Sequence, residues 1–422
     1  MTGSAIKHRS GLGSVTLSEL WLFITLFALE NFACLVPEKQ YIVSSIKYSD
    51  IGVILAFFWA VPVILRHFGH HRIKMHFIIP AVLAVVSICL SAMSGYLQLG
   101  QPVILGILPF RKMLITGFLC IAIFMDLRSG HLSKKRLLTM LYVIGAIELI
   151  LFTTQALLAG RATFLYLNTG ETRLGMTRLR VPFLLTMVLG ILSFRLALTN
   201  REMNGFKKVF HIIFCIWSIL LLAFIAQHRA PTIILVISYI AAFFLWRGNV
   251  ANKMAGFVLL IVLISAFTST AVFQSSISVL TGEDTNASTS TLAIRESGQQ
   301  YYLDKIQDSP LFGFGIPNDD YFPATLAAGE ASNYYLADNG VYGFLYQLGF
   351  FGLLWLAITY VNAIRLAIRI YRRNGGFSYL QYFIFETGNL YMGMHWFYYY
   401  PLPFMIAIVL LDYDYGYTGD SK

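Results

Sequence analysis

Residues 254–273 read MAGFVLLIVLISAFTSTAVF, and residues 341–364 read VYGFLYQLGFFGLLWLAITYVNAI. Each run is long enough to cross a bilayer as a helix, which takes about 20 apolar residues. Between them lies the one long polar segment of the chain, residues 274–340. Two spans that enclose a long polar loop therefore set the framework, and loops of this length usually present functional groups.

The composition extends the pattern to the whole chain. Hydrophobic residues make up 57% of the 422 residues and charged residues only 12%, whereas soluble domains carry about 25% charged residues. This excludes a soluble globular protein. All four cysteines fall inside apolar runs, which argues against disulfides, and the usual metal-ligand spacings are absent. We therefore expect a single polytopic membrane domain over residues 1–422, with no cofactor and no metal.

Apolar runs of suitable length recur along the chain. They lie near residues 17–36, 50–65, 77–97, 112–127, 137–159, 181–198, 209–227, 231–246, 254–273, 341–364, 377–396 and 401–413. Lys and Arg residues gather in alternate loops, and such residues favour the cytoplasmic side. The pattern predicts an all-α integral membrane protein with about 12 transmembrane helices. Both termini would be cytoplasmic, and the opposite face would carry the loop at 160–180 and the long loop near 274–340.

The charge balance follows from this topology. The net charge of +10 comes mainly from short basic loops on one face, so it does not indicate binding to nucleic acid. Asp412-Tyr413-Asp414 is similar to a nucleotide-sugar metal motif. Its position near the C-terminus predicts a solvated cytoplasmic tail instead.

Arginines on the opposite face stand out, because positive residues are disfavoured there. These residues are Arg161, Arg173, Arg178, Arg180, Arg229 and Arg295. Guanidinium groups bind phosphate oxygens through paired, charge-assisted hydrogen bonds. One interpretation is that several of them converge on a lipid pyrophosphate. The alternative is that they extend to lipid headgroups or pair with nearby carboxylates.

Three carboxylates lie inside predicted spans: Glu30, Glu148 and Glu386. Ionisable groups at such positions usually face a bundle interior or a cavity. They can belong to a proton path, which keeps a transporter open as an interpretation. They can also be neutral and hydrogen-bonded, or lie close to the end of a span.

Several local motifs occur in a fixed order along the outer face. They are Arg173-Leu174-Gly175, Arg229, Arg295, Pro310-Leu311-Phe312-Gly313-Phe314-Gly315, Asp338-Asn339 and Gly349-Phe350-Phe351-Gly352. In order and placement they resemble the bacterial O-antigen polymerase and O-antigen ligase superfamily. The resemblance covers the layout of most of the chain and the local motifs between about residues 173 and 360.

The resemblance implies a metal-independent membrane glycosyltransferase of the bacterial inner membrane. Its reaction would polymerise undecaprenyl-pyrophosphate-linked repeat units of O-antigen or a similar surface polysaccharide on the periplasmic face. The implied partners are these lipid-linked glycans and the bilayer, with a chain-length regulator protein as a further candidate.

Two alternatives remain. An O-antigen ligase would transfer polymer to lipid A-core, but such ligases carry a histidine where this chain has Asp338. Residues 274–340 contain no histidine, which favours a polymerase. A lipid-linked oligosaccharide flippase is the alternative of another class, and the lack of internal repeats argues against it.

The resemblance assigns the active site to the loops at 160–180 and 274–340. Arg229 and Arg295 would stabilise the charge that builds on the departing pyrophosphate, while Arg173, Arg178 and Arg180 would help to bind it. Asp338 would act as a base or orient the acceptor hydroxyl. Alternatively, it caps the following helix.

The remaining predicted residues concern the sugar. Gly313 and Gly315 permit a tight backbone turn that would shape a sugar pocket, and Asn339 would bind substrate beside Asp338. Tyr301 and Tyr335 offer flat surfaces for sugar stacking. They are equally compatible with an aromatic belt at the membrane interface.

Overall fold

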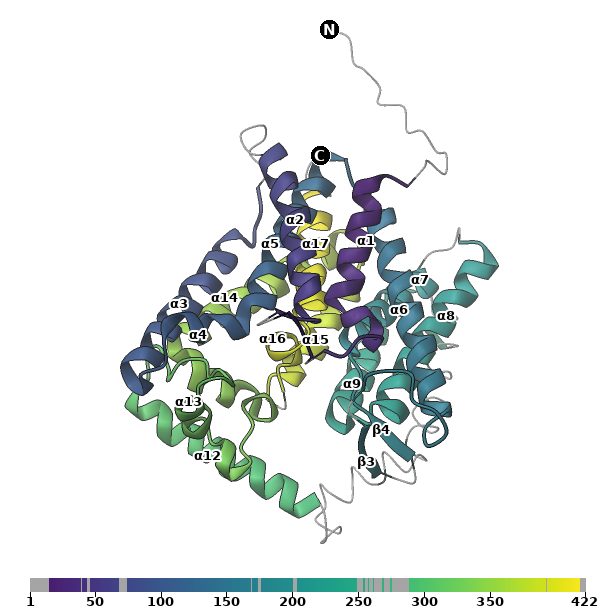
Figure 1. The fold of residues 1–422 in the computed structure, drawn as a ribbon. Coiled ribbons are helices and arrows are strands. Elements are labelled where there is room, and N and C mark those ends of the chain that lie inside the picture. Colours follow the sequence, from purple (N-terminus) through teal and green to yellow (C-terminus); the bar gives the residue numbers. More distant parts are fainter. Residues whose placement is uncertain are drawn as a thin grey trace.

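The structure is a computed structural model, and it is mostly helical (Figure 1). It describes residues 15–38, 40–43, 46–67, 74–167, 169–173, 176–199, 203–248, 288–391 and 393–417, with isolated residues between 253 and 274. Most of the predicted span at 254–273 and the beginning of the long loop lie outside the described residues, as do both extreme termini.

Six described segments are long and apolar enough to cross a membrane. They are α2 (Asp50–His67), α3 (Ile78–Leu99), Val103–Ser129, α6 (Lys134–Leu157), Gly205–Ile225 and Leu336–Asn374. Val103–Ser129 comprises α4 (Val103–Ile107), η2 (Leu108–Phe110) and α5 (Arg111–Ser129). Gly205–Ile225 comprises α8 (Gly205–Leu220) and η3 (Leu221–Ile225). Leu336–Asn374 comprises η5 (Leu336–Asn339) and α14 (Gly340–Asn374). Large apolar side chains such as Phe58 and Leu97 face outward, as a lipid-facing surface requires. The multi-pass membrane class is thus confirmed.

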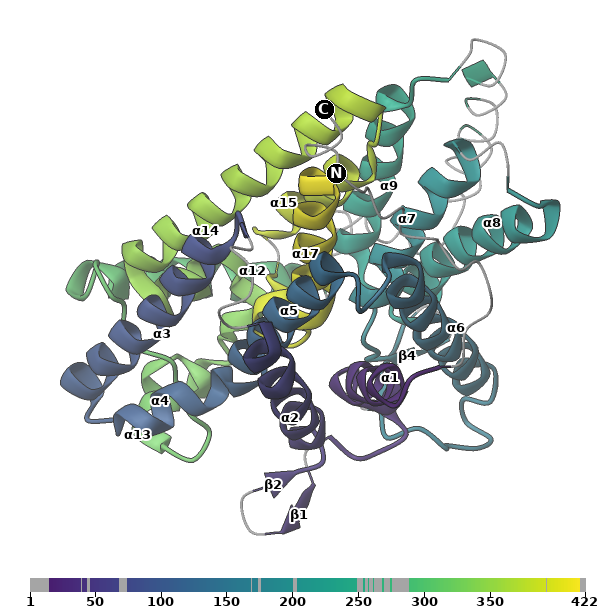
Figure 2. The ribbon, with the colours of Figure 1, turned by 90° about the horizontal axis from the view of Figure 1, so that it is seen from above.

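Shorter helices complete the bundle. They are α1 (Leu17–Leu29), α7 (Leu184–Thr199), α9 (Arg229–Leu245), α15 (Ser378–Asn389), α16 (His395–Tyr398) and α17 (Pro401–Tyr417). Every predicted apolar run except 254–273 overlaps a described helix. The number twelve stays a prediction, because several of these helices are shorter than a full span. Seen from above, α17 lies centrally, with α5 and α14 packed against it (Figure 2).

The first predicted span is shorter than expected. A capping box between Thr16 and Glu19 starts α1, but the helix ends at Leu29 rather than near residue 36. The next turn, η1 (Asn31–Cys34), has positive φ angles of 50–62° at each of its four residues. Left-handed backbone is unfavourable for side-chain-bearing residues, so packing must hold this turn in place.

The prediction of an all-α chain also needs a correction. Two antiparallel hairpins occur in loops on the predicted outer face: β1 (Tyr41–Val43) with β2 (Ile46–Lys47), and β3 (Thr169–Arg173) with β4 (Met176–Leu179). In the second hairpin Thr172 pairs with Thr177. Strand pairing satisfies backbone groups that no helix covers in these loops, and β-branched threonine suits it.

The predicted basic loops gather at one end of the bundle, where α1 begins and α17 ends (Figure 1). Arg136 pairs with Glu19, Lys134 lies 2.6 Å from Asp414, and the His76 ring lies 2.6 Å from Asp412. The prediction of a solvated tail at 412–414 is therefore wrong. Asp412 is only 1% exposed, because it anchors the last turns of α17 against the start of α3.

The described part of the long loop, residues 288–340, is folded. It contains α12 (Ser288–Asp308), α13 (Phe322–Ala327), η4 (Glu330–Ser332) and η5, which lie at the end opposite the basic loops (Figure 1). Buried aromatic rings attach α12 to α14: Tyr302 and Phe314 both pack on Tyr346, with ring centroids 5.3 Å apart in each pair.

The glycine turn that follows α12 packs against two helices. Gly313 and Gly315 have positive φ angles of 70° and 89°. A Cβ on Gly313 would lie 2.5 Å from the Gln347 carbonyl oxygen, and one on Gly315 would lie 2.6 Å from Gly95 Cα. Gly349 has φ 61° at the kink of α14 beside the same turn. The glycines therefore serve close backbone packing.

Candidate active site

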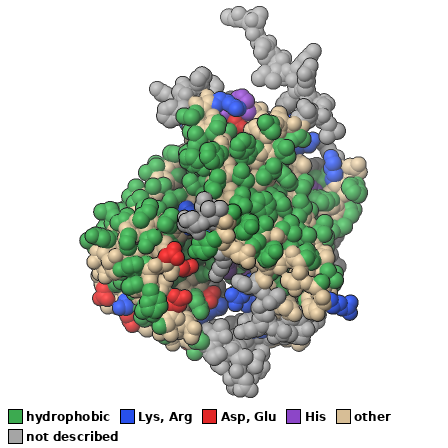
Figure 3. All heavy atoms as spheres, viewed as in Figure 1, with side chains coloured by type: hydrophobic (Ala, Val, Ile, Leu, Met, Phe, Trp, Pro, Cys, Tyr) green, Lys and Arg blue, Asp and Glu red, His purple; other side chains and the backbone are tan. Residues whose placement is uncertain are grey.

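Five segments that are far apart in sequence meet at the end of the bundle that carries α12 and the β3–β4 hairpin. They are β4, the turn between η3 and α9, α12, η5 and α16. In the space-filling view, Lys and Arg side chains border a hollow between α12–α13 and β3–β4, with acidic side chains on the α12–α13 side (Figure 3). The residues below form this cluster.

Arg178 connects the hairpin to the start of α9. Its Nε donates a hydrogen bond to the Ala226 carbonyl at 3.1 Å, and its Nη2 lies 3.5 Å from Nδ1 of His228. Because a guanidinium is only a donor, Nδ1 of His228 accepts in this contact. Arg178 is half-buried, whereas Arg180 just beyond β4 is exposed.

Three rings form the centre of the cluster. The buried Phe183 ring lies 4.8 Å from His228 and 5.3 Å from His395, and the two imidazoles are 5.5 Å apart between centroids. His228 precedes α9 and His395 is the first residue of α16. The tertiary fold thus brings together two histidines that no local motif joins.

The turn that leads into α9 is strained. Gln227 is buried and has φ 49°, and the preceding η3 is a π-helix. Both features cost energy and are typical of functional sites. Arg229 is half-buried as the first residue of α9. The helix dipole disfavours a cation there, so an anion bound beside Arg229 would relieve that repulsion.

Arg295 reaches the cluster because α12 crosses η5 closely. A Cβ on Gly298 would lie 3.1 Å from Nδ2 of Asn339. Arg295 is half-buried one turn earlier on α12, and residues three apart share a helix face. Asn339 is 2% exposed and donates to the Tyr335 carbonyl at 2.9 Å. The Asn339 side chain therefore makes this hydrogen bond within the protein, and its role in substrate binding stays a prediction.

The segment before α16 runs along η5. The Val341 amide donates to the Leu390 carbonyl at 2.8 Å. A Cβ on Gly393 would lie 3.2 Å from the Ala337 carbonyl oxygen and 3.4 Å from Nε2 of His395. This approach places the imidazole beside the turn that carries Asp338.

The charges around His395 determine its protonation. The pKa of His395 is lowered to about 4, mainly by burial; Asp338 acts to raise it, and Arg178 and Arg295 act to lower it. The imidazole is therefore neutral near pH 7 and can accept a proton. The pKa of the His395 ring thus depends on three predicted site residues: Arg178 on β4, Arg295 on α12 and Asp338 on η5.

Asp338 is available to a substrate. Its side chain is exposed, and the residue that precedes α14 as its N-cap is Asn339, with no side-chain hydrogen bond at that cap. The interpretation of Asp338 as the helix cap is therefore wrong. Asp338 also interacts electrostatically with Tyr399, as does Arg180.

Other predicted residues lie elsewhere or make structural contacts. Tyr301 donates to the Ala327 carbonyl at 2.7 Å and packs on Tyr334, whereas Tyr335 is exposed. Gly313 and Gly315 contact the backbone of α14 and α3. Arg173 ends β3, and its side chain lies outside the described residues. None of these contacts tests a role in sugar binding.

The carboxylates inside the helical bundle are all buried. Glu30, Glu148 and Glu386 are 2%, 0% and 3% exposed. Glu30 follows the last residue of α1, as the interpretation of a span end anticipates, and it interacts electrostatically with Glu148. Whether they form a proton path stays a prediction.

Sequence reasoning missed both histidines of the cluster. His228 adjoins Arg229, which was singled out, and His395 precedes a run of five aromatic residues, 396–400. An ionisable residue in an otherwise apolar stretch was the available signal. Neither signal indicates that the two rings lie together.

Residues 213–357 match the sequence model of the family described as O-antigen ligase. No curated protein and no solved structure matches the chain. The matched segment contains Arg229, Arg295 and Asp338, and the motif order, the apolar helices and the folded outer loop agree with it. Over these residues the chain is similar to the O-antigen ligase family, and its apolar helices are those of a multi-pass membrane protein.

Proposed function

We propose that this protein polymerises undecaprenyl-pyrophosphate-linked oligosaccharide repeat units by glycosyl transfer on the periplasmic face of the bacterial inner membrane. One observation carries the proposal: His395 lies beside the turn that carries Asp338, and its ring packs on His228, which Arg178 contacts from β4. Guanidinium groups bind pyrophosphate oxygens, and a neutral imidazole can accept the proton of a hydroxyl group. The family match supports lipid-linked glycans as substrates.

The reaction joins two sugars. The hydroxyl oxygen of the acceptor repeat unit forms a bond to the anomeric carbon of the donor glycan, and the bond from that carbon to the pyrophosphate oxygen breaks. The bonding electron pair leaves with undecaprenyl pyrophosphate. His395 takes the hydroxyl proton, and the Asp338 carboxylate stabilises the resulting imidazolium.

The arginines have two effects in this scheme. Arg229 and Arg295 stabilise the negative charge that develops on the leaving pyrophosphate, and such preorganised charge is often the largest single contribution to catalysis. Before the donor binds, Arg178 and Arg295 lower the pKa of His395. A bound pyrophosphate offsets their charge and acts to raise the pKa of His395, while burial, the main cause of the lowered pKa, continues to act.

A second candidate function is ligation of finished polymer to lipid A-core. The argument against it was that the long loop lacks a histidine. His395 weakens that argument, because it lies beside the turn of Asp338 and can supply the missing imidazole. The same cluster serves either acceptor, and only the product separates the two functions.

A surface-glycan gel separates them. A strain that lacks the gene would be complemented with the wild type, with His395→Ala, or with His211→Ala as a matched control, since His211 contacts Ser193 on α7. We expect single repeats on the usual anchor without the gene and with His395→Ala, and full-length polymer with the control.

Other products would change the conclusion. Loss of all anchored glycan, with long polymer retained on the carrier lipid, would identify a ligase. Single units trapped on the cytoplasmic leaflet would identify a flippase. Wild-type polymer from His395→Ala would remove His395 from the mechanism while leaving the polymerase proposal to the gene deletion.

A further inference from the structure

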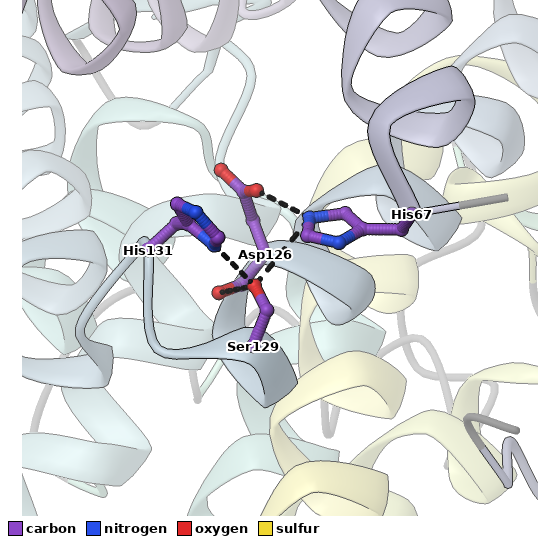
Figure 4. A network of polar contacts seen from close by, with 4 residues as sticks. All are labelled: His67, Asp126, Ser129 and His131. Atoms are coloured by element: carbon purple, nitrogen blue, oxygen red, sulfur yellow. Dashed lines mark hydrogen bonds and ion pairs between the residues drawn. The ribbon is translucent and has the colours of Figure 1, made fainter. Parts of the chain in front are cut away.

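A second polar cluster lies at the opposite end of the bundle, where α2 and α5 end. It consists of His67, Asp126, Ser129 and His131 (Figure 4). His67 is 7% and Asp126 5% exposed, while His131 is exposed. The glycosyl-transfer scheme uses none of these residues.

Their geometry is that of a metal-ligand set. Nε2 of His67 lies 3.0 Å from Oδ1 of Asp126, and one ligand atom from each of His67, Asp126 and His131 lies within 4.8 Å of the other two. Zinc binds imidazole nitrogen and carboxylate oxygen at about 2.0–2.2 Å, so the edges of its tetrahedron are about 3.3–3.6 Å. The 3.0 Å pair is slightly shorter than such an edge and the other separations are at most 4.8 Å, so the side chains would adjust when the ion binds.

Ser129 supports the arrangement. Its hydroxyl donates to the Asp126 carbonyl at 3.0 Å and lies 2.8 Å from Nδ1 of His131 and 3.4 Å from Nε2 of His67. It therefore holds both rings against the turn that ends α5. The Ser129 hydroxyl contacts the same His67 nitrogen that faces Asp126, so a bound ion would replace this contact.

Space for an ion and its water lies next to the cluster. Asp126 and His131 line a cavity of about 230 Å³ that is also lined by Glu19 and Arg66. Glu19 is already paired with Arg136, so the Asp126 carboxylate and the two imidazoles are the ligand groups beside this space. Two imidazoles and one carboxylate leave a fourth position for water, an arrangement common for zinc and related divalent transition metals.

We propose that His67, Asp126 and His131 bind one divalent transition-metal ion of the zinc class at this end of the bundle. The ion joins the C-terminal ends of α2 and α5 to the turn before α6. It lies apart from the arginine and histidine cluster, so its role is to stabilise the bundle and it takes no part in glycosyl transfer.

Cobalt and zinc titrations test the site. The full-length protein would be purified in detergent with an affinity tag that contains no histidine, stripped with a chelator and titrated with Co²⁺, followed by Zn²⁺. We expect one Co²⁺ per chain with the visible spectrum of a low-symmetry N/O site, displaced by Zn²⁺. Zn²⁺ should also raise the melting temperature.

Variants localise the ion. His131→Asn changes an exposed side chain, so it should fold, and we expect at least tenfold weaker binding with no gain in melting temperature. His211→Asn is the matched control and should bind like the wild type. Binding that survives in His131→Asn, or that vanishes only in a His70→Asn/His71→Asn variant, would overturn the proposed ligand set. Absence of stoichiometric binding in the wild type would overturn the site itself.

Discussion

The two ends of this helical bundle use charge in opposite ways. At the end where α17 finishes, Glu19 pairs with Arg136, Asp412 with His76 and Asp414 with Lys134. At the other end, Arg178 and Arg295 act together on one neutral imidazole, with Asp338 as the opposing charge. The first end thus pairs these three carboxylates with basic side chains. The second end has one such pair, Arg111 with Asp50, and in addition a cluster of two arginines, one carboxylate and a histidine.

The difference shows how to separate structural from functional charge in a membrane protein. A cation paired with a buried carboxylate compensates the cost of burial and fixes two helices. Cations gathered around a neutral base raise the energy of the empty protein, and an anionic ligand relieves it. Substitutions at the paired end should therefore change the melting temperature, and substitutions at the arginine end should change the turnover.

The largest expected effect is on catalysis at the arginine end. Arg295→Ala and Arg229→Ala should each lower turnover by about 10²–10³-fold, the usual effect of removing one group that stabilises transition-state charge. The melting temperature should stay near that of the wild type. Polymerisation of purified lipid-linked repeat units in detergent, together with a thermal melt, would measure both.

Arg161→Ala is the matched control for these variants, because Arg161 is an exposed arginine on the same outer face. It should retain wild-type turnover. Full activity in both Arg229→Ala and Arg295→Ala would contradict the pyrophosphate role.

The glycine turn should show the next largest effect, this time on stability. Gly315→Ala adds a Cβ 2.6 Å from Gly95 Cα at φ 89°, whereas Gly160→Ala has φ 81° and nothing within 4 Å. Both variants carry backbone strain of about 1–2 kcal/mol, and only the first adds a clash. Thermal melts should show the larger loss for Gly315→Ala; equal losses would mean that the turn does not pack closely on α3.

At the paired end, Arg136→Ala should lower stability without changing turnover per folded molecule. It leaves Glu19, which is 5% exposed, without its ion-pair partner, and an uncompensated buried polar group costs about 1–3 kcal/mol. The double variant Glu19→Gln/Arg136→Ala should recover part of the loss. A fall in turnover comparable to that of Arg295→Ala would erase the distinction between the two ends.

The smallest expected effect is a shift in the pH profile. His395 must be neutral to accept a proton, so activity falls as pH drops through its pKa, which is about 4 in the free protein. Asp338→Asn removes a charge that raises this pKa and should move the acid limb of kcat/KM to lower pH. Arg178→Gln removes a charge that lowers it and should move the limb to higher pH. Identical limbs in both variants would exclude His395 as the titrating group.

The parts of the fold that depend on neighbouring residues were predictable from the sequence. Hydropathy located the helices, because an apolar run long enough to span a bilayer has few alternatives to a helix. It misplaced the end of the first span, where Asn31–Cys34 leave the helical conformation, and it gave no sign of the two hairpins. Tertiary packing determines these features, and hydropathy does not record it.

The site was predictable only in part. The bias of Lys and Arg against outer loops, together with the motif order, selected Arg178, Arg229, Arg295 and Asp338. An arginine in an outer loop is unusual, and the sequence alone reveals it. His228 and His395 were missed, since a histidine in an apolar stretch more often makes an ordinary buried contact. Asp412 was misassigned because its partner, His76, lies 336 residues away.

The sequence by itself determined the membrane class and the positions of most helices, and it singled out the arginines of the predicted outer face, since hydropathy, charge bias and motif order are properties of neighbouring residues. Only the tertiary structure decided which charges meet. It placed His395 beside Asp338 and Arg136 beside Glu19, because a contact between distant residues depends on how the helices pack. That packing distinguishes a charge pair that joins two helices from the charge cluster that we propose as the active site.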